Sequence, residues 1–364
     1  MNMTRMTRGQ TGTQLNTVMA FHFVTFGSGD ITNKNFRQMN QRYSRPKMLL
    51  LAATAGLFFF AIFMPGFFSS LIPALASKAA GDNDKPVWLT ETISVDTPAA
   101  LTLETSGGFI DIDSHQHDEI VVDFIVRKNR EYLRDTDEAP VEITINQDES
   151  VVEVFSKVTS DSRWFRRSPS VSVSYQVLVP SDTRIRAKTS GGPVSGRNLS
   201  ADVSFVTSGG GIDAQNISGT LLARTSGGPI SLEGITGDMT ARTSGGGITV
   251  SDATGNLKAR TSGGPITLRS VSGTIEAVTS GGPIDAGIPE IGEFLTLETS
   301  GGPISVKLPD HQGLDIRARG SSIQNNLDDL DGLMEQRSLS GTVKGGGVPV
   351  DIKTTGGGVR LDYY

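Results

Sequence analysis

Three arginines recur at equal intervals in the second half of the chain. Arg224, Arg242 and Arg260 each come directly before a threonine that opens the letters TSGG. If the residues around them alternate in and out of a sheet, the three guanidinium groups point outward, one per repeat. Like charges at that spacing repel each other unless they are solvated, paired or bound to an anion. We expect either a solvated face with Glu233 or Asp252 as partners, or a basic stripe that binds acidic glycans or lipid headgroups.

A second candidate is a short basic and aromatic stretch between two expected strands. It consists of Arg163, Trp164, Phe165, Arg166 and Arg167. Basic and aromatic side chains together on a loop suit a membrane interface or a partner protein. The alternative is a loop whose tryptophan packs on its own sheet.

Metal and cofactor chemistry finds little support in the sequence. His115 and His117 could chelate a metal with Asp113 or Asp118, but they are two of only four histidines and occupy what reads as an exposed strand end. The chain has no cysteine, which excludes disulfides, thiolate zinc sites and a cysteine nucleophile. The glycine-rich stretches lack the spacing of phosphate-binding loops. We therefore predict no metal site, no cofactor and no catalytic residue.

A carbohydrate-active enzyme of the β-helix class would need clustered carboxylates. The outward position after the first isoleucine of each repeat holds Asp213 and Asp285, with no acid at the same position in the repeats between them. Four repeats stacked at the usual strand spacing separate these two acids by about 19 Å, which is too far for them to act as a pair. An enzyme is therefore kept only as an alternative.

The elements that position these residues are repeats. The TSGG letters recur at five equal gaps followed by one that is slightly longer, and the opening threonines are Thr189, Thr207, Thr225, Thr243, Thr261, Thr279 and Thr299. Apolar and polar residues alternate within each repeat, as in Ile230-x-Leu232 and Met239-x-Ala241. This alternation predicts two short strands with one buried face per repeat, joined by two glycine-containing bends.

Two all-β architectures fit that count. An antiparallel meander would use Gly-Gly as a hairpin loop, whereas a single-stranded β-solenoid, or β-helix, would stack one coil of about 18 residues on the next. A tight hairpin needs the N–H of the residue after the second glycine, and proline removes that donor in several repeats, for example at Pro229 and Pro265. We therefore predict the solenoid. We expect its corner glycines to adopt φ > 0, and its stacked threonines and serines to exchange hydroxyl hydrogen bonds.

The flanks of the repeats are less regular. An early copy of the motif and several strand-like stretches precede them, so we assign residues 99–182 to a first coil and strand excursion that form an N-terminal cap. Residues 183–324 form the regular solenoid and residues 325–364 a C-terminal cap. Within this second cap, residues 325–336 are expected to form a short helix or a polar loop.

The N-terminal part has the character of a targeting segment. Residues 48–76 form an apolar stretch without formal charge, long enough to cross a bilayer as a helix. It is either a transmembrane signal anchor or a signal peptide cleaved after Ala76. We interpret residues 1–47 as a disordered leader, cytoplasmic or non-native, and residues 77–98 as a linker. Because the positive residues precede the apolar stretch, we expect the rest of the chain to be periplasmic or extracellular.

The order of these segments resembles a known family. An early SGGFIDI copy is followed by VLVPSDTRIRAKTSGG, serial TSGGPI repeats and a terminal GGGVPVDIKTTGGGVRL, over roughly residues 87–364. This order is similar to the DUF4097 family of β-strand-repeat candidate adhesins, relatives of the GIN-type adhesin-head domains. The resemblance implies an extracytoplasmic β-solenoid linked to envelope upkeep or adhesion, with no catalytic residues to carry over.

We expect a non-enzymatic, adhesin-like or scaffold module of the cell envelope, tethered to the membrane through residues 48–76. Its partner would be an acidic glycan, a lipid headgroup or a membrane protein, and exposed end coils could allow self-association. Nucleic acid is excluded as a partner because 26 basic and 38 acidic residues follow position 76. The alternatives are a regulatory partner in envelope-stress signalling and a β-helix carbohydrate-active enzyme.

Overall fold

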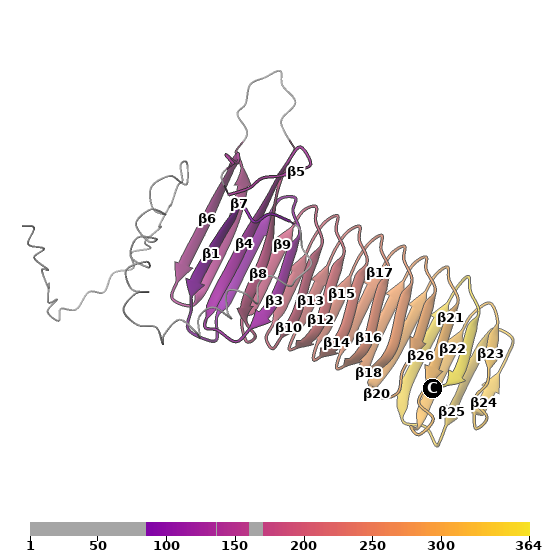
Figure 1. Ribbon diagram of the computed structural model, residues 1–364. Coiled ribbons are helices and arrows are strands. Elements are labelled where there is room, and N and C mark those ends of the chain that lie inside the picture. Colours follow the sequence, from indigo (N-terminus) through magenta and orange to yellow (C-terminus); the bar gives the residue numbers. More distant parts are fainter. Residues whose placement is uncertain (1–84, 136, 160–169) are drawn as a thin grey trace, which may run out of the picture. The chain divides into compact units, whose positions relative to one another are not determined.

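The computed structural model describes residues 85–135, 137–159 and 170–364, which form an all-β fold (Figure 1). These residues contain 27 strands and no helix. Accordingly, no helix in this part of the chain is long and apolar enough to cross a membrane. The apolar segment 48–76 and the loop 163–167 lie outside the described residues.

Each regular repeat supplies one strand to each of two sheets, A and B. β18 (Ile266–Thr279) continues around one bend and pairs in both sheets. The other regular strands of sheet B are β11 (Val203–Val206), β13 (Leu221–Arg224), β15 (Met239–Arg242) and β17 (Leu257–Thr261), and those of sheet A are β12 (Ile212–Ser218), β14 (Ile230–Thr236) and β16 (Ile248–Thr254).

Neighbouring repeats pair in parallel, and the offset between paired residues is the same from one repeat to the next. Ile230 lies opposite Ile248 in sheet A, and Arg224 lies opposite Arg242 in sheet B. This register confirms the expected parallel stacking and excludes an antiparallel meander for these repeats. Figure 1 shows the repeats following one another as a row of nearly parallel ribbons. We call one repeat, with its sheet B strand and the sheet A strand that follows, a coil.

The apolar side chains fill the space between the two sheets. In the coil of β13 and β14, the side chains of Leu221, Ala223, Ile230 and Leu232 are buried, while the residues between them face outward. A single coil would leave its apolar face uncovered by neighbours along the stack, so the array rather than the repeat is the folding unit.

Threonine hydroxyl groups hold the TSGG corner by bonding to the backbone. The buried Thr243 donates from Oγ1 to the carbonyl oxygen of Gly228 in the preceding coil at 2.9 Å, and it accepts from the N–H of Gly246 at 3.2 Å. The donor bond recurs at every TSGG threonine from Thr189 to Thr299. The expected exchange of hydroxyl bonds between stacked side chains is therefore wrong for these threonines, because a buried carbonyl outside the strand ladders needs a donor.

Close packing of backbones requires the second glycine of the corner. A Cβ placed on Gly246 would lie 2.1 Å from the carbonyl oxygen of Gly228, and the same clash recurs in every regular coil. These corner glycines do not have positive φ, so our expectation of φ > 0 at the TSGG corner is wrong. Positive φ occurs instead at the second bend of the coil, as at Gly237 with φ of 128°.

The chain leaves and re-enters the stack at its N-terminal end. The first coil, β2 and β3, lies beside β9 and β10, and the excursion adds β7 and β8 on the other side of that coil. Antiparallel strands then close this end, β4 and β1 in sheet A and β6 in sheet B. The strands are β1 (Leu89–Ser94), β2 (Ala100–Thr105), β3 (Ile110–His115), β4 (Glu119–Lys128), β5 (Glu131–Tyr132), β6 (Val141–Asp148), β7 (Val151–Val158), β8 (Val171–Pro180), β9 (Arg184–Thr189) and β10 (Val194–Leu199).

A comparable exchange of order occurs at the C-terminal end. The last coil, β26 and β27, lies between the coil of β20 and β21 and the coil of β22 and β23. β24 and β25 then end sheet B in antiparallel pairing, so the expected helix or polar loop at 325–336 is wrong for the residues of β24. The strands are β19 (Ile284–Gly287), β20 (Ile291–Thr299), β21 (Ile304–Leu308), β22 (Leu314–Arg319), β23 (Ile323–Asn325), β24 (Asp331–Met334), β25 (Ser338–Val343), β26 (Val348–Thr354) and β27 (Val359–Tyr363).

Candidate functional site

The two outer faces of the coils differ in the sign of their charge. The neighbouring sheet B strands β9, β11, β13, β15 and β17 contain no acidic residue. The sheet A strands β10, β12, β14 and β16 contain three acids, Asp213, Glu233 and Asp252, and one basic residue, Arg197. The basic residues of the five sheet B strands are Arg184, Arg186, Lys188, Arg224, Arg242, Lys258 and Arg260. We call the outer side of these five strands the basic face.

The structure brings the three predicted arginines together on the basic face. Arg224, Arg242 and Arg260 lie directly opposite one another on β13, β15 and β17, and all three side chains are exposed. Arg260 forms an ion pair with Glu276 of the next coil. Within the described part of the chain, Arg224 and Arg242 have no ion pair.

The ion pairs of the basic face lie at its margins. Lys188 pairs with Glu104 at 3.4 Å, and Arg184 approaches Asp202 at 3.9 Å. The expected partners Glu233 and Asp252 belong to β14 and β16 of sheet A, on the other side of the core. Arg186 and Lys258 resemble Arg224 and Arg242 in having no ion pair among the described residues. The basic face therefore carries four cations without an ion pair to a described residue, although Lys258 on β17 lies opposite Glu276 of β18.

A shallow hollow lies at one margin of the basic face. It has a volume of about 390 Å³ and is lined by the outward residues Thr102, Arg186, Ser204 and Leu222 of four neighbouring strands, with Arg184 and Asp202 beside them. The lining combines cationic, hydroxyl and apolar groups with one carboxylate, that of Asp202, which lies 3.9 Å from Arg184 Nε. Such a surface can hold a polar chain that carries negative charge.

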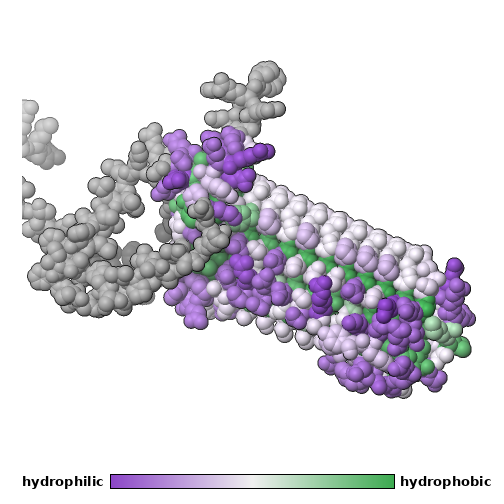
Figure 2. All heavy atoms as spheres, turned by 45° about the vertical axis from the view of Figure 1, so that its right-hand side comes forward, coloured by the Kyte–Doolittle hydropathy of each residue, from purple (hydrophilic) through white to green (hydrophobic). Residues whose placement is uncertain are grey.

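The side chains along the regular coils are mostly weakly polar. Figure 2 shows pale rows and a green hydrophobic row along the stack, with strongly hydrophilic residues gathered at both of its ends. The exposed serine of each TSGG corner, such as Ser226 and Ser244, contributes to this weakly polar surface. The basic residues of the basic face therefore lie among side chains that are mostly uncharged.

The histidine pair is engaged within the protein. The ring of His115 is 2.7 Å from the carbonyl oxygen of Glu119 through Nε2, and the ring of His117 meets it edge-on at 5.4 Å between centroids. Across residues 85–135, 137–159 and 170–364, no group of three or more His, Cys, Asp and Glu residues gathers where it could hold a metal ion.

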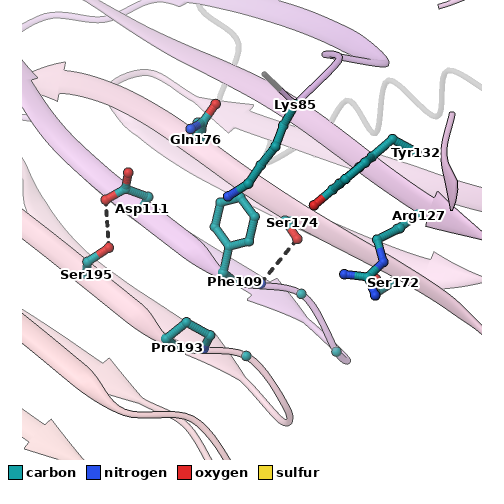
Figure 3. Close-up of a pocket in the computed structure, with 13 residues that line it drawn as sticks. Lys85, Phe109, Asp111, Arg127, Tyr132, Ser172, Ser174, Gln176, Pro193 and Ser195 are labelled. Carbon is teal, nitrogen blue, oxygen red and sulfur yellow. Dashed lines mark hydrogen bonds between the residues drawn. The ribbon is translucent and has the colours of Figure 1, made fainter. Parts of the chain in front are cut away.

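A second hollow, which sequence reasoning missed, lies beside the first corner on the outer side of sheet A (Figure 3). Its volume is about 460 Å³. Lys85 lies over the ring of Phe109, with Nζ 4.4 Å from the centroid, and the guanidinium carbon of Arg127 is 5.7 Å from the centroid of Tyr132. Asp111 lies at the other side of the hollow in Figure 3.

The hollow rests on a firmly anchored strand. Tyr175 of β8 is fully buried, its ring packs edge-on against Phe124 at 5.4 Å, and its hydroxyl donates to the carbonyl oxygen of Glu104 at 2.8 Å. Burial raises the pKa of Tyr175 well above its usual range. The neighbours Ser174 and Gln176 therefore line the hollow from a fixed position.

One sequence signal could have indicated this hollow. Phe109 is followed by Ile110, which lies opposite Val194, so Phe109 occupies the place that proline holds at Pro193. Other coils have proline or glycine at this position, so an aromatic residue here indicates a corner that differs from the others. The other residues of the hollow come from five further segments, and no local pattern connects them.

Comparisons with known proteins place the fold in a family. The family described as Toastrack DUF4097 matches residues 93–362. No curated protein matches the chain. Similar solved structures include a candidate cell-adhesion protein from Clostridium sporogenes, with 13% identity, 76% of this chain and 99% of that chain covered, and a TM-score of 0.21. Another is a candidate adhesin from Bacteroides fragilis, with 14% identity, coverage of 75% and 96%, and a TM-score of 0.34. Because the family match spans most of the sequence, the chain belongs to the Toastrack DUF4097 family.

Proposed function

We propose that the protein is a non-enzymatic, adhesin-like module in which a single-stranded β-solenoid binds an acidic polymer of the cell envelope along its basic face. One observation carries the proposal. Arg224 and Arg242 lie side by side, exposed, in a row of basic residues that no acid of the described sheet B strands β9 to β17 interrupts.

The physical argument rests on repulsion within the row. Strands in a sheet lie about 4.8 Å apart, and two unit charges at that distance repel by on the order of 1 kcal/mol even in bulk water. The coil does not require arginine here, since the same register position holds Val278 in β18. A polymer with closely spaced negative charges would relieve the repulsion along the whole row. This supports an extended acidic ligand, a glycan in the first instance.

The proposed location is outside the cytoplasmic membrane, with residues 48–76 as anchor or cleaved signal. The apolar character of that segment and the basic residues before it support this part of the proposal. An acidic body with one basic face would be kept away from anionic surfaces in most orientations and would bind them in one.

The absence of catalysis is also part of the proposal. Asp213 and Asp285 share one outward column of sheet A but are separated by the coils of Ser231, Thr249 and Thr267. At the usual strand spacing these acids are about 19 Å apart, beyond the reach of an acid and base pair.

The test is a crosslinking pull-down with the full-length protein from intact envelope. The triple variant Arg224→Ser, Arg242→Ser, Arg260→Ser should lose an acidic glycan that the wild type captures. A matched control replaces Arg269, Arg317 and Arg319 by serine, three exposed arginines outside the basic face. Equal glycan capture by both variants would contradict the proposal. Capture of one defined membrane protein instead would favour the regulatory role, and turnover of glycan by the purified protein would favour an enzyme.

A further inference from the structure

The hollow beside Phe109 is a second candidate binding site, distinct from the basic face. We call it the corner pocket and define it by Lys85, Phe109, Asp111, Arg127, Tyr132 and Gln176. These residues belong to sheet A or to segments beside it. Its volume of about 460 Å³ falls in the range of small-molecule sites, and Figure 3 shows its polar groups around one space.

The corner pocket presents two cations that are already oriented. Lys85 and Arg127 each lie over an aromatic ring, Phe109 and Tyr132 respectively. A cation–π contact restrains the side chain but leaves most of its N–H donors free. Within the described residues, neither Lys85 nor Arg127 has an ion pair. Both cations can therefore bind an external anion.

The carboxylate of the pocket does not neutralise them. Asp111 accepts a hydrogen bond from Ser195 Oγ at 2.6 Å and pairs with Arg197 Nη2 at 3.1 Å. Arg197 also approaches Asp113 through Nε at 3.5 Å. Asp111 thus has partners of its own on β10, and the side of the pocket near Lys85 and Arg127 keeps a positive charge.

Uncharged polar groups complete the lining. Gln176 offers an amide, and Ser172 offers a hydroxyl on the same strand, β8. Ser174 is less available, because its Oγ accepts the N–H of Phe109 at 3.2 Å. Amide and hydroxyl groups beside an aromatic ring suit the hydroxyl groups of a sugar, and the two cations suit a carboxylate.

We propose that the corner pocket binds one carboxylated sugar unit, with the carboxylate held by Lys85 and Arg127 and the sugar hydroxyls bonded to Gln176 and Ser172. The inference deepens the proposed function and rests on it for the ligand class: the basic face would hold an acidic chain, and the pocket a single unit, either free or at the end of a chain.

The test titrates full-length protein with sodium D-glucuronate, with D-glucose and inorganic phosphate as comparison ligands, by calorimetry. Glucuronate should bind at least tenfold more tightly than glucose or phosphate. Lys85→Gln and Arg127→Gln should each weaken glucuronate at least tenfold, whereas Arg127→Lys should retain most of the affinity. The matched control Arg319→Gln removes the same charge from an exposed site in β22 and should bind as the wild type does.

Three outcomes would overturn the inference: no glucuronate binding by the wild type, equal binding of glucose or phosphate, or undiminished binding in both glutamine variants. The variant Arg224→Ser, Arg242→Ser should bind glucuronate normally. If glucuronate binds but polymer capture is unaffected by the basic-face variants, the proposed function is refuted and the pocket proposal stands. If polymer capture depends on the basic face but glucuronate does not bind, the pocket proposal alone is refuted.

Discussion

The basic face and the outer side of sheet A belong to the same coils yet carry opposite charge. Both faces are built by alternating strands over one core, and both repeat at the same constant offset along the sequence. On sheet B the column before each corner threonine includes Arg224, Arg242 and Arg260, whereas sheet A presents Asp213, Glu233 and Asp252.

The difference shows which positions of the repeat are required by the fold and which can vary in charge. Contacts with the backbone determine the residue type at the corner, since Thr243 donates a hydrogen bond to a carbonyl and Gly246 permits close contact between coils. No such contact determines the residue type at an outward position, so valine, arginine and glutamate all occur in one column at Val206, Arg242 and Glu298. The charge separation is therefore a property of this sequence and not of the fold.

The largest expected effect on stability comes from a substitution at the corner that both sheets share. In Gly246→Ala the new Cβ would lie 2.1 Å from the carbonyl oxygen of Gly228, so the coils must separate. We expect a loss of about 3 kcal/mol in the free energy of unfolding, measured by urea denaturation. The control Gly245→Ala places its Cβ 3.2 Å from Gly227 and should cost no more than about 1 kcal/mol. Equal losses would contradict the backbone-contact explanation.

A smaller loss of stability should follow when the corner loses its hydroxyl. Thr243→Val keeps the shape of the side chain but removes the bonds to Gly228 and Gly246. Leaving a buried carbonyl and a part-buried N–H without partners should lower the free energy of unfolding by about 1–3 kcal/mol. Thr243→Ser keeps the hydroxyl and should lose less, and the explanation fails if serine and valine are equally destabilising.

Polymer binding to the basic face should depend on the salt concentration, which can be tested without any substitution. Exposed charges are screened over about 10 Å at moderate ionic strength, so binding of polygalacturonate to the basic face should weaken roughly tenfold from low to physiological salt. Surface plasmon resonance on the immobilised polymer measures this. Affinity that does not change with salt would indicate that the face binds through other forces.

The smallest effect is expected on sheet A. Glu233→Gln with Asp252→Asn removes two exposed negative charges from the side opposite the basic face. Polymer affinity should rise less than about twofold, because the core separates these groups from the bound chain. A large gain in the same binding assay would show that the faces do not act separately.

Much of the fold could be predicted from the sequence because its signal is local and repeated. The alternation around Ile230 and Leu232 predicted the buried side, and the prolines after the corner glycines favoured stacked coils over hairpins. The reason for the corner glycines could not be found in this way, since the atom that excludes a Cβ at Gly246 belongs to the preceding coil. The same limit explains the misassigned β24, whose strand character depends on pairing with β25.

The candidate sites divide along the same line. The arginine column was visible because its members share one register position in the repeat. The corner pocket was not visible, because Lys85, Arg127 and Gln176 come from separate segments that only the strand order of the N-terminal end brings together. A row of residues at one repeat position can be recognised from the sequence. A pocket whose residues come from separate segments can be recognised only in the structure.

The claim that the basic face is the binding surface is tested most directly by reversing its charge. Polygalacturonate affinity should be measured for the full-length protein and for Arg224→Glu, Arg242→Glu, alongside the free energy of unfolding of each. We predict at least a hundredfold loss of affinity, because two attractive groups become repulsive, with stability changed by less than about 1 kcal/mol. Unchanged affinity in a folded variant would contradict the account.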